Sequence, residues 1–166
     1  MRTVDEIPVA YTPPGGWHGE MPAPILAGCD EPIMDDAPDL RGTWRTVRVE
    51  RDGVELPDHH LTKHVERIEQ CGDRVVVTSE GIIHDMRADG VLEHGVHDVA
   101  GGNNFDSPVH VAAVFNAGRL DLHPMGVHPE RPPLVTREVI GGELIWHYGP
   151  LIVTMRRTDD HVQDAG

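Results

Sequence analysis

From Arg41 onward, apolar and polar positions alternate in short runs, and each run ends at a turn signal rich in glycine, proline, aspartate or asparagine. In order, the runs read GTWRTVRVE, KHVERIEQ, RVVVTSE, IIHDMRA, GVLEHGVHDVA, PVHVAAVF, RLDLHP, LVTREVI, ELIWHY and LIVTMRR. About ten strands at spacings of roughly 8–12 residues are typical of a sandwich or barrel. No long segment has a helical apolar repeat, and a helical turn is expected only across Leu56–Lys63. The pattern predicts an all-β fold.

Residues 1–40 have a different texture, with many prolines and glycines and no apolar period. This composition predicts an irregular segment, either a disordered tail or a strap packed on the strands. Trp17, Met21, Ile25 and Leu26 supply apolar surface to bury, which favours the strap. The predicted organisation is a strap over residues 1–40, a barrel over residues 41–158 and a disordered tail over residues 159–166.

Two tight turns near the C-terminus set the register of three strands, and register decides which face each side chain occupies. With Gly141-Gly142 as a two-residue loop, Arg137 lies opposite Trp146. The face that carries them is otherwise apolar, so we predict that it is the interior. The turn at Gly149-Pro150 continues this face into the last strand. Its members are Val135, Arg137, Val139, Leu144, Trp146, Tyr148, Leu151, Val153 and Met155.

A third turn, Ala117-Gly118, separates a predicted interior face from a polar outer face. The interior face holds Val109, Val111, Ala113, Phe115, Leu120 and Leu122, and the outer face holds His110, Arg119, Asp121 and His123. A barrel of about eight to ten strands is wide enough to hold a small ligand. Because aromatic residues make up only 4% of the chain, we expect the side chains to leave an internal cavity.

Arg137 is the single cation on the predicted interior face. A buried guanidinium is costly unless it is paired. One interpretation is an anchor that binds a ligand carboxylate with both arms of its fork. The other is an arginine stacked on Trp146 with its charged end in water at the barrel mouth. The sequence leaves both open.

The twelve histidines suggest two further sites. His59, His60 and His64 match no known zinc motif, and His110, His123 and His147 fall on predicted solvent faces, so we expect no metal site. A hairpin at Asp89-Gly90 would place Asp85 opposite His94, and His84 near His97. These four side chains form either exposed ion pairs or, inside the barrel, a general base.

Charge and cysteine usage limit the partners. A net charge of −14 repels phosphate backbones and anionic lipids, which argues against nucleic-acid and membrane partners. The N-terminus lacks the basic start and apolar core of a signal peptide, and no apolar run approaches the ~20 residues of a membrane helix. Cys29 and Cys71 make neither a disulfide framework nor a thiolate metal site. We therefore expect a cytoplasmic protein with both thiols reduced.

Three segments resemble the calycin superfamily of lipocalins and fatty-acid-binding proteins. LRGTWRTVRVE is similar to their first strand, where a Gly-x-Trp motif closes the barrel floor, and Gly42 and Trp44 match that motif. TREVIGGELI is similar to a late hairpin of fatty-acid-binding proteins whose arginine faces the acid group of the ligand, and Arg137 is the matching position. LIVTMRR resembles their last strand, which carries a second arginine of this kind. Alignment favours Arg156 for that role, whereas the hairpin register turns Arg157 inward.

The chain also departs from these families. It lacks the two-helix lid that follows the first strand, and the strap is a candidate to replace that lid. Thr158 stands where a tyrosine accompanies the final arginine. The chain is similar in length to nitrobindin, a haem-binding barrel, but the Gly-x-Trp-x-Gly-x-Gly pattern of nitrobindin is broken after Trp44.

These features predict a calycin-like up-and-down barrel that binds an apolar small molecule bearing an acid group, without a cofactor. The predicted ligand contacts are Arg137, Trp146, Tyr148, Val135, Phe115, Leu122, Val153, Met155, Arg156 and Arg157. Three alternatives remain: a haem or metal carrier, a structural protein with a filled barrel, and a cofactor-free isomerase, cyclase or hydratase. The enzyme would use His84, Asp85, His94 or His97.

Overall fold

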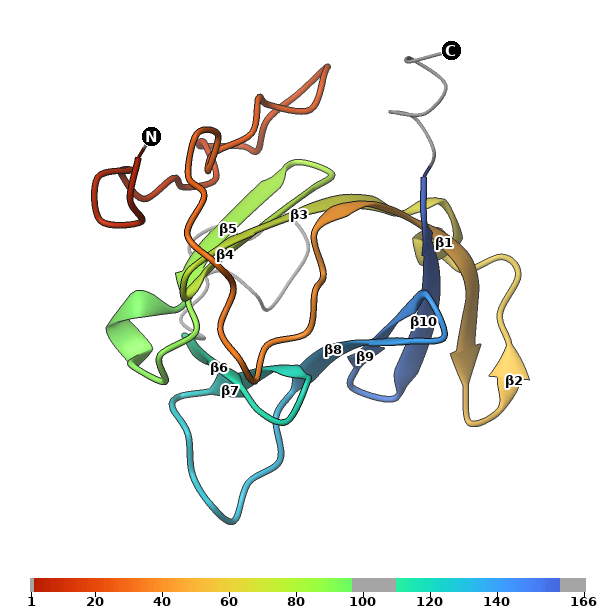
Figure 1. Cartoon of the computed structure of the whole chain (residues 1–166). Coiled ribbons are helices and arrows are strands. Elements are labelled where there is room, and N and C mark those ends of the chain that lie inside the picture. Colours follow the sequence, from red (N-terminus) through yellow and green to blue (C-terminus); the bar gives the residue numbers. More distant parts are fainter. Residues whose placement is uncertain (1, 97–109, 159–166) are drawn as a thin grey trace.

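The computed structural model describes residues 2–96 and 110–158, and its strands form one antiparallel sheet that curls into a nearly closed barrel (Figure 1). The strands are β1 (Gly42–Arg51), β2 (Val54–Glu55), β3 (Val65–Cys71), β4 (Arg74–Ser79), β5 (Ile82–Arg87), β6 (Val111–Phe115), β7 (Leu120–Pro124), β8 (Val135–Ile140), β9 (Glu143–Tyr148) and β10 (Leu151–Arg157). They are ordered β5-β4-β3-β1-β10-β9-β8-β7-β6, with β2 paired to β1. The predicted all-β, antiparallel up-and-down barrel is confirmed.

The described residues contain two helices, the short 3-10 turns η1 (His60–Lys63) and η2 (Leu92–His94), and neither is long enough to cross a membrane. The first lies where a helical turn was expected. The second replaces a predicted strand, so the predicted hairpin at Asp89-Gly90 is wrong. The Asp89 carboxylate accepts hydrogen bonds from the backbone N–H of Val91 and from the His94 ring, at 3.0 and 2.6 Å, and these bonds stabilise a helical turn instead.

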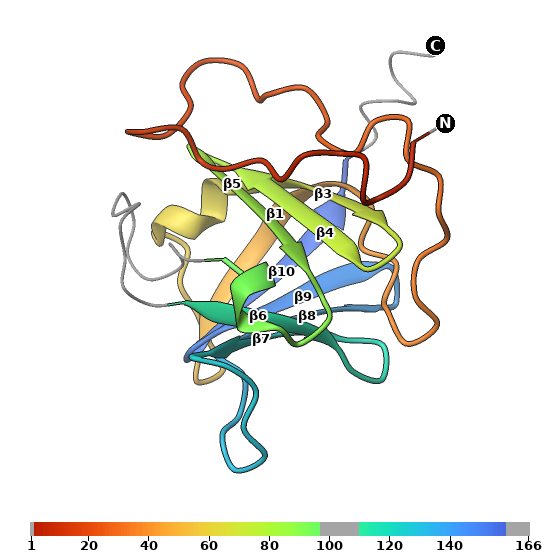
Figure 2. The same ribbon diagram turned by 90° about the vertical axis from the view of Figure 1, so that its left-hand side faces the viewer.

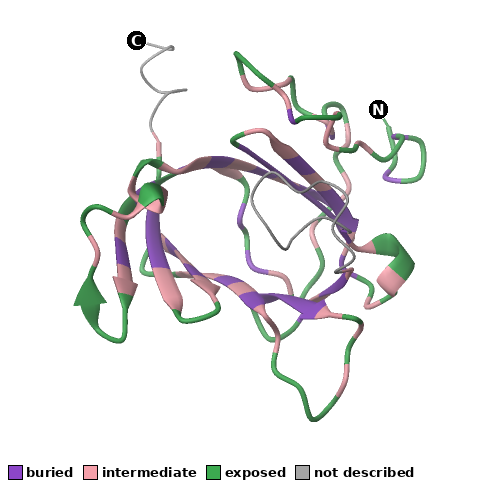
Figure 3. Ribbon diagram, turned by 180° about the vertical axis from the view of Figure 1, so that it is seen from behind, coloured by how far each residue is buried: buried purple, intermediate pink, exposed green. Residues whose placement is uncertain are grey.

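All three predicted hairpin registers are confirmed. Arg137 pairs with Trp146 across β8 and β9, Val153 pairs with Trp146 across β9 and β10, and Ala113 pairs with Leu122 across β6 and β7. The predicted apolar interior residues between 111 and 155 join one core cluster, and buried positions alternate along β8 and β9, whereas β4 is buried throughout (Figure 3). Val109 lies outside the described residues.

The outer face of β7 is less exposed than predicted. Asp121 and His123 are both buried, so the expected solvent exposure of these two side chains is wrong. Arg119 covers the carboxylate of Asp121 with two hydrogen bonds, of 2.5 and 2.9 Å. A charged side chain can therefore be buried on the outer face when a neighbour on the same strand face pairs with it.

Trp44 and Gly42, the two residues of the Gly-x-Trp motif, lie at the start of β1, and the role of Trp44 in closing the barrel stays a prediction. Trp44 is fully buried, and its Nε1 donates to the carbonyl oxygen of Leu40 at 2.7 Å. The guanidinium of Arg157 lies 4.4 Å from the centre of the Trp44 ring. Gly42 has a φ of +132°, and a Cβ there would lie 3.2 Å from Arg157 Nε, so positive φ and close packing both favour glycine.

We call the N-terminal segment, residues 2–40, the strap. Its first part runs across the outer face of β3, β4 and β5 (Figure 2). Its last part reaches the β6–β7 turn, where Gly118 N–H donates to Asp36 O at 2.9 Å, and Leu40 joins the core inside the barrel. Val4, Ile7 and Leu26 form an apolar cluster with buried residues of that face. The strap also reaches the β4–β5 turn, where Trp17 donates to Ile82 O from its ring at 3.0 Å and to Gly81 O from its backbone at 3.1 Å. Burial of apolar surface and these hydrogen bonds hold the strap against the barrel wall.

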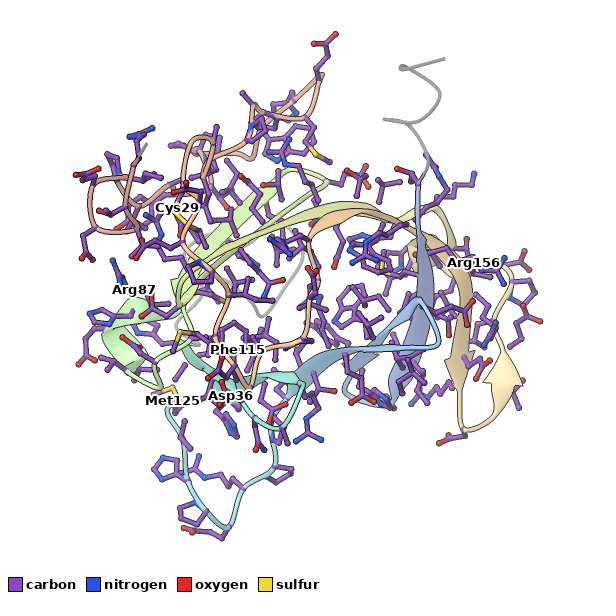
Figure 4. The ribbon with its side chains drawn as sticks, viewed as in Figure 1. Cys29, Asp36, Arg87, Phe115, Met125 and Arg156 are labelled. Carbon is purple, nitrogen blue, oxygen red and sulfur yellow. A yellow bond between two sulfur atoms is a disulfide. The ribbon has the colours of Figure 1, made fainter. Side chains whose placement is uncertain are left out.

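A disulfide joins Cys29 of the strap to Cys71 at the end of β3, on the side of the barrel away from Arg156 (Figure 4). The prediction of two reduced thiols is therefore wrong, because the strap brings together two cysteines that are 42 residues apart. The cytoplasmic localisation was predicted from reduced thiols, whereas disulfides persist mainly in oxidising compartments. The disulfide therefore removes this support, and the localisation stays a prediction. Within the described residues, Cys29, Glu31 and Cys71 form the one grouping of three possible metal ligands, and its two sulfurs are bonded to each other.

Candidate functional site

A cavity of about 600 Å³ lies inside the barrel and opens at one end. This volume is within the range of small-molecule sites, roughly 300–1,000 Å³. The apolar part of its wall includes Val77, Met86, Leu122, Val135 and Tyr148. The mouth is formed by the first residues of η1, the β4–β5 turn and residues 15–18 of the strap. Residues 15–18 of the strap therefore form part of the cavity mouth, the place where fatty-acid-binding proteins carry their helical lid.

The floor of the cavity is an ion pair between Glu66 of β3 and Arg137 of β8, two strands that are not neighbours in the sheet. Arg137 Nε donates to Glu66 Oε2 at 3.0 Å, and Arg137 Nη2 donates to Glu66 Oε1 at 3.2 Å. Glu66 is 0% exposed and Arg137 is 6% exposed. The next interior positions on β3 and β9, Ile68 and Leu144, belong to the packed core and do not line the cavity.

Glu66 is ionised despite its complete burial. Burial by itself raises the pKa of this carboxyl, but the charge of Arg137 and the hydrogen bond from His64 outweigh burial and lower the pKa to about 2. At neutral pH the carboxylate and the guanidinium therefore balance each other. The floor of the cavity carries strong dipoles but no net charge from this pair.

His64 follows η1 and contacts the same carboxylate, with Nε2 at 2.8 Å from Glu66 Oε1. An ionised carboxylate only accepts hydrogen bonds, so we assign the imidazole proton to Nε2, which leaves Nδ1 of the neutral ring as an acceptor. Nδ1 makes no hydrogen bond to the described residues and is not fully enclosed. Its ring packs on Trp146, with 5.1 Å between the ring centres.

Arg137 has N–H groups that bind no other described residue. Two of its N–H groups bind Glu66, and Nη1 has no hydrogen-bond partner in residues 2–96 and 110–158 yet is not sealed from solvent. The guanidinium carbon lies 4.7 Å from the centre of the Trp146 ring, which holds it in a cation–π contact. The floor therefore offers a ligand an open donor, Arg137 Nη1, and an open acceptor, His64 Nδ1.

Five of the predicted ligand contacts line the cavity: Arg137, Trp146, Tyr148, Val135 and Leu122. Arg137 does stack on Trp146, but its charged end is buried, so the interpretation with that end in water is wrong. The carboxylate it binds in this structure belongs to Glu66. Whether it also contacts a ligand acid group stays a prediction.

The other predicted contacts lie elsewhere. Phe115, Val153 and Met155 pack in the core and do not line the cavity. Arg156 is 67% exposed on the outer surface, where it pairs with Glu143 (Figure 4). Arg157 has the inward register, but its guanidinium stacks on Trp44 and donates to Asp39 O and Arg41 O, outside the cavity. Neither arginine lines the cavity, because both stand at the far end of β10.

The predicted acid–base residues do not meet in the barrel cavity. His84 lines that cavity, whereas Asp85 points to the opposite face of β5 and binds Arg74. Asp85 and His94 both line a second, smaller cavity of about 220 Å³, where Asp85 pairs with Arg74 and His94 with Asp89. His97 lies outside the described residues. Glu66 was not predicted as a site residue, and His64 was considered only as a metal ligand. Gly72-Asp73 as a two-residue turn would have placed Glu66 on the same face as Ile68 and Val77, the register that the structure shows.

No protein-family model matches the chain, and no curated protein matches it. Among solved structures, human cRBP IV is similar, with 18% sequence identity and a TM-score of 0.46. The match covers 72% of this chain and 98% of that chain.

Proposed function

We propose that the barrel binds a small, largely apolar molecule whose uncharged oxygen group, a carbonyl or a hydroxyl, reaches the cavity floor. The observation that carries the proposal is the Glu66–Arg137 pair, which is already balanced in charge but leaves Arg137 Nη1 open toward the cavity. A neutral oxygen accepts a hydrogen bond from Nη1 without adding charge to a buried site.

A ligand carboxylate fits this floor less well than the family resemblance implies. It would bring a second negative charge close to Glu66, and one guanidinium does not neutralise two carboxylates. The proposal therefore keeps the apolar ligand of the sequence analysis and replaces its acid group with a neutral one.

The apolar wall supplies most of the expected affinity. Each buried methylene contributes ~0.8 kcal/mol, so a chain of about eight to ten carbons supports micromolar binding after the costs of ordering. The hydrogen bond at the floor mainly orients the ligand.

Displacement of Nile red, a neutral dye, tests the proposal with four ligands of equal chain length: decane, decanol, methyl octyl ketone and decanoic acid. At slightly alkaline pH, where the acid is ionised, we expect the ketone and the alcohol to bind about tenfold more tightly than the acid and than decane. Tighter binding of decanoate would restore the acid ligand and overturn the neutral one. No dye binding and no displacement would indicate a filled barrel.

A matched variant separates orientation from apolar binding. Arg137→Leu alone leaves Glu66 buried and uncompensated, which threatens the fold. The double variant Glu66→Leu with Arg137→Leu removes both charges together. We expect it to bind decane as well as the wild type does and to lose the preference for the ketone and the alcohol. An unchanged preference would remove Arg137 from the site.

A further inference from the structure

We propose that the cavity floor is a proton-transfer site with His64 as its general base, acting on a β,γ-unsaturated carbonyl compound and converting it to the conjugated α,β-isomer. This inference rests on the proposed binding of a neutral ligand and adds a reaction class to it.

The first support is the way His64 is held. Glu66 Oε1 lies 2.8 Å from Nε2, and Glu66 is itself held by two hydrogen bonds from Arg137. A carboxylate in this position keeps the imidazole in one tautomer and stabilises the imidazolium that forms when the ring takes a proton. His64 also lines the cavity, and its second nitrogen, Nδ1, is not fully enclosed by the described residues.

The second support is that the base and the donor meet at one carboxylate and one ring. His64 Nε2 and Arg137 Nη2 bind the same oxygen, Glu66 Oε1, at 2.8 and 3.2 Å. The His64 ring and the Arg137 guanidinium also pack on the same Trp146 ring, with 5.1 and 4.7 Å to its centre. The two groups are therefore neighbours on the cavity floor, and the inference requires one ligand to present its carbonyl oxygen to Arg137 Nη1 and the C–H group of the neighbouring carbon to His64 Nδ1.

The reaction balances with these groups alone. His64 Nδ1 takes the proton from the carbon between the carbonyl and the double bond, and the electron pair of that C–H bond forms a dienolate. Arg137 Nη1 donates to the dienolate oxygen, where negative charge develops. His64 then returns the proton to the γ-carbon, and the carbonyl re-forms next to the shifted double bond. The carbon skeleton is neither oxidised nor reduced.

The chain offers a matched control for His64. His94 also pairs with a carboxylate, Asp89, at 2.6 Å, but it lies on η2 away from the cavity. A general effect of removing a paired histidine would appear in both variants. An effect on the reaction would appear only at His64.

The probe is an unbranched β,γ-unsaturated ketone of about ten carbons, and the absorbance of the conjugated isomer reports turnover. We expect the wild type to accelerate the isomerisation above the buffer rate, and His64→Gln to lower the rate at least about 100-fold while displacement of Nile red by the ketone is unchanged. His94→Gln should leave both rate and displacement unchanged.

The outcomes separate this inference from the binding proposal. If the ketone binds but the wild type does not accelerate its isomerisation, or if His64→Gln retains the rate, the proton-transfer role is wrong and binding stands. If the ketone neither binds nor displaces the dye, the proposed function fails as well. Should His64→Gln lose its fold, the α-deuterated ketone decides with the wild type, because breaking the α C–H bond must slow its isomerisation relative to the unlabelled ketone, and equal rates overturn the inference.

Discussion

Among the described residues, two arginine–carboxylate pairs have both partners buried, one on each side of the barrel wall, and they differ in how completely their hydrogen bonds are used. On the outer side, Arg74 of β4 pairs with Asp85 of β5 beneath the strap. All five N–H groups of Arg74 are engaged, two with Asp85 and three with the strap carbonyls of Val4, Ile7 and Pro8.

The inner pair, Arg137 and Glu66, has the same chemistry but is left incomplete. Arg137 engages only two N–H groups within the described residues, both with Glu66, and Nη1 is open to the cavity. The outer pair holds a segment of backbone in place, since Asp85 also accepts the N–H of Ala10 at 2.9 Å. Burial and pairing alone therefore do not identify a site, whereas open donors and acceptors facing a cavity do.

Breaking the outer pair should produce the largest effect. Asp85→Leu leaves the Arg74 guanidinium buried without its counter-charge, and we expect a loss of about 3–5 kcal/mol in the free energy of unfolding, measured by urea denaturation. A loss below about 1 kcal/mol would show that the strap carbonyls alone satisfy Arg74.

Replacing both outer partners sharpens the comparison. Arg74→Met with Asp85→Leu removes both charges, but it also removes the donors of three strap carbonyls and the acceptor of Ala10 N–H. We expect this double variant to remain destabilised by at least about 2 kcal/mol. Full recovery would mean that the hydrogen bonds to the strap contribute little.

The inner pair should make stability depend on pH. The pKa of Glu66 is lowered from 4.5 to about 2, so the folded state binds its proton more weakly than the unfolded state does. The resulting stabilisation is present above about pH 4.5 and is lost as the pH falls toward about 2, with a size of about 3 kcal/mol. Urea denaturation across this range, compared with the Glu66→Leu/Arg137→Leu variant, isolates the contribution, because the variant lacks this carboxyl. Parallel curves of unfolding free energy against pH for the two proteins would contradict this contribution of Glu66.

Replacing both inner partners should have the smallest effect on stability. No strap backbone depends on Glu66 or Arg137 for a hydrogen bond, so we expect Glu66→Leu with Arg137→Leu to change the free energy of unfolding by no more than about 1 kcal/mol. The same urea measurement checks this. A loss as large as that of the outer double variant would show that the inner pair is structural and would remove the contrast between the two.

The interior position of Arg137 could be predicted because strand parity is local. Once Gly141-Gly142 is taken as a tight turn, every residue of β8 and β9 is assigned to a face, and the structure has the same register. The interior position of Glu66 could be predicted in the same way, provided that Gly72-Asp73 is also taken as a two-residue turn. The hairpin predicted at Asp89-Gly90 was wrong because strand parity applies only where strands form. There the Asp89 side chain accepts local hydrogen bonds, which replace the strand with a helical turn.

The sequence by itself determined an antiparallel barrel with an apolar inner face and one arginine on that face, because alternation along a strand and the geometry of tight turns act over a few residues. Only the tertiary structure decided what that arginine meets. Glu66 lies 71 residues away in the chain and reaches Arg137 across the barrel, and Cys29 reaches Cys71 only because the strap crosses the outer wall. Contacts of this kind depend on the curvature of the closed sheet and the path of an irregular segment, and no periodic pattern encodes either.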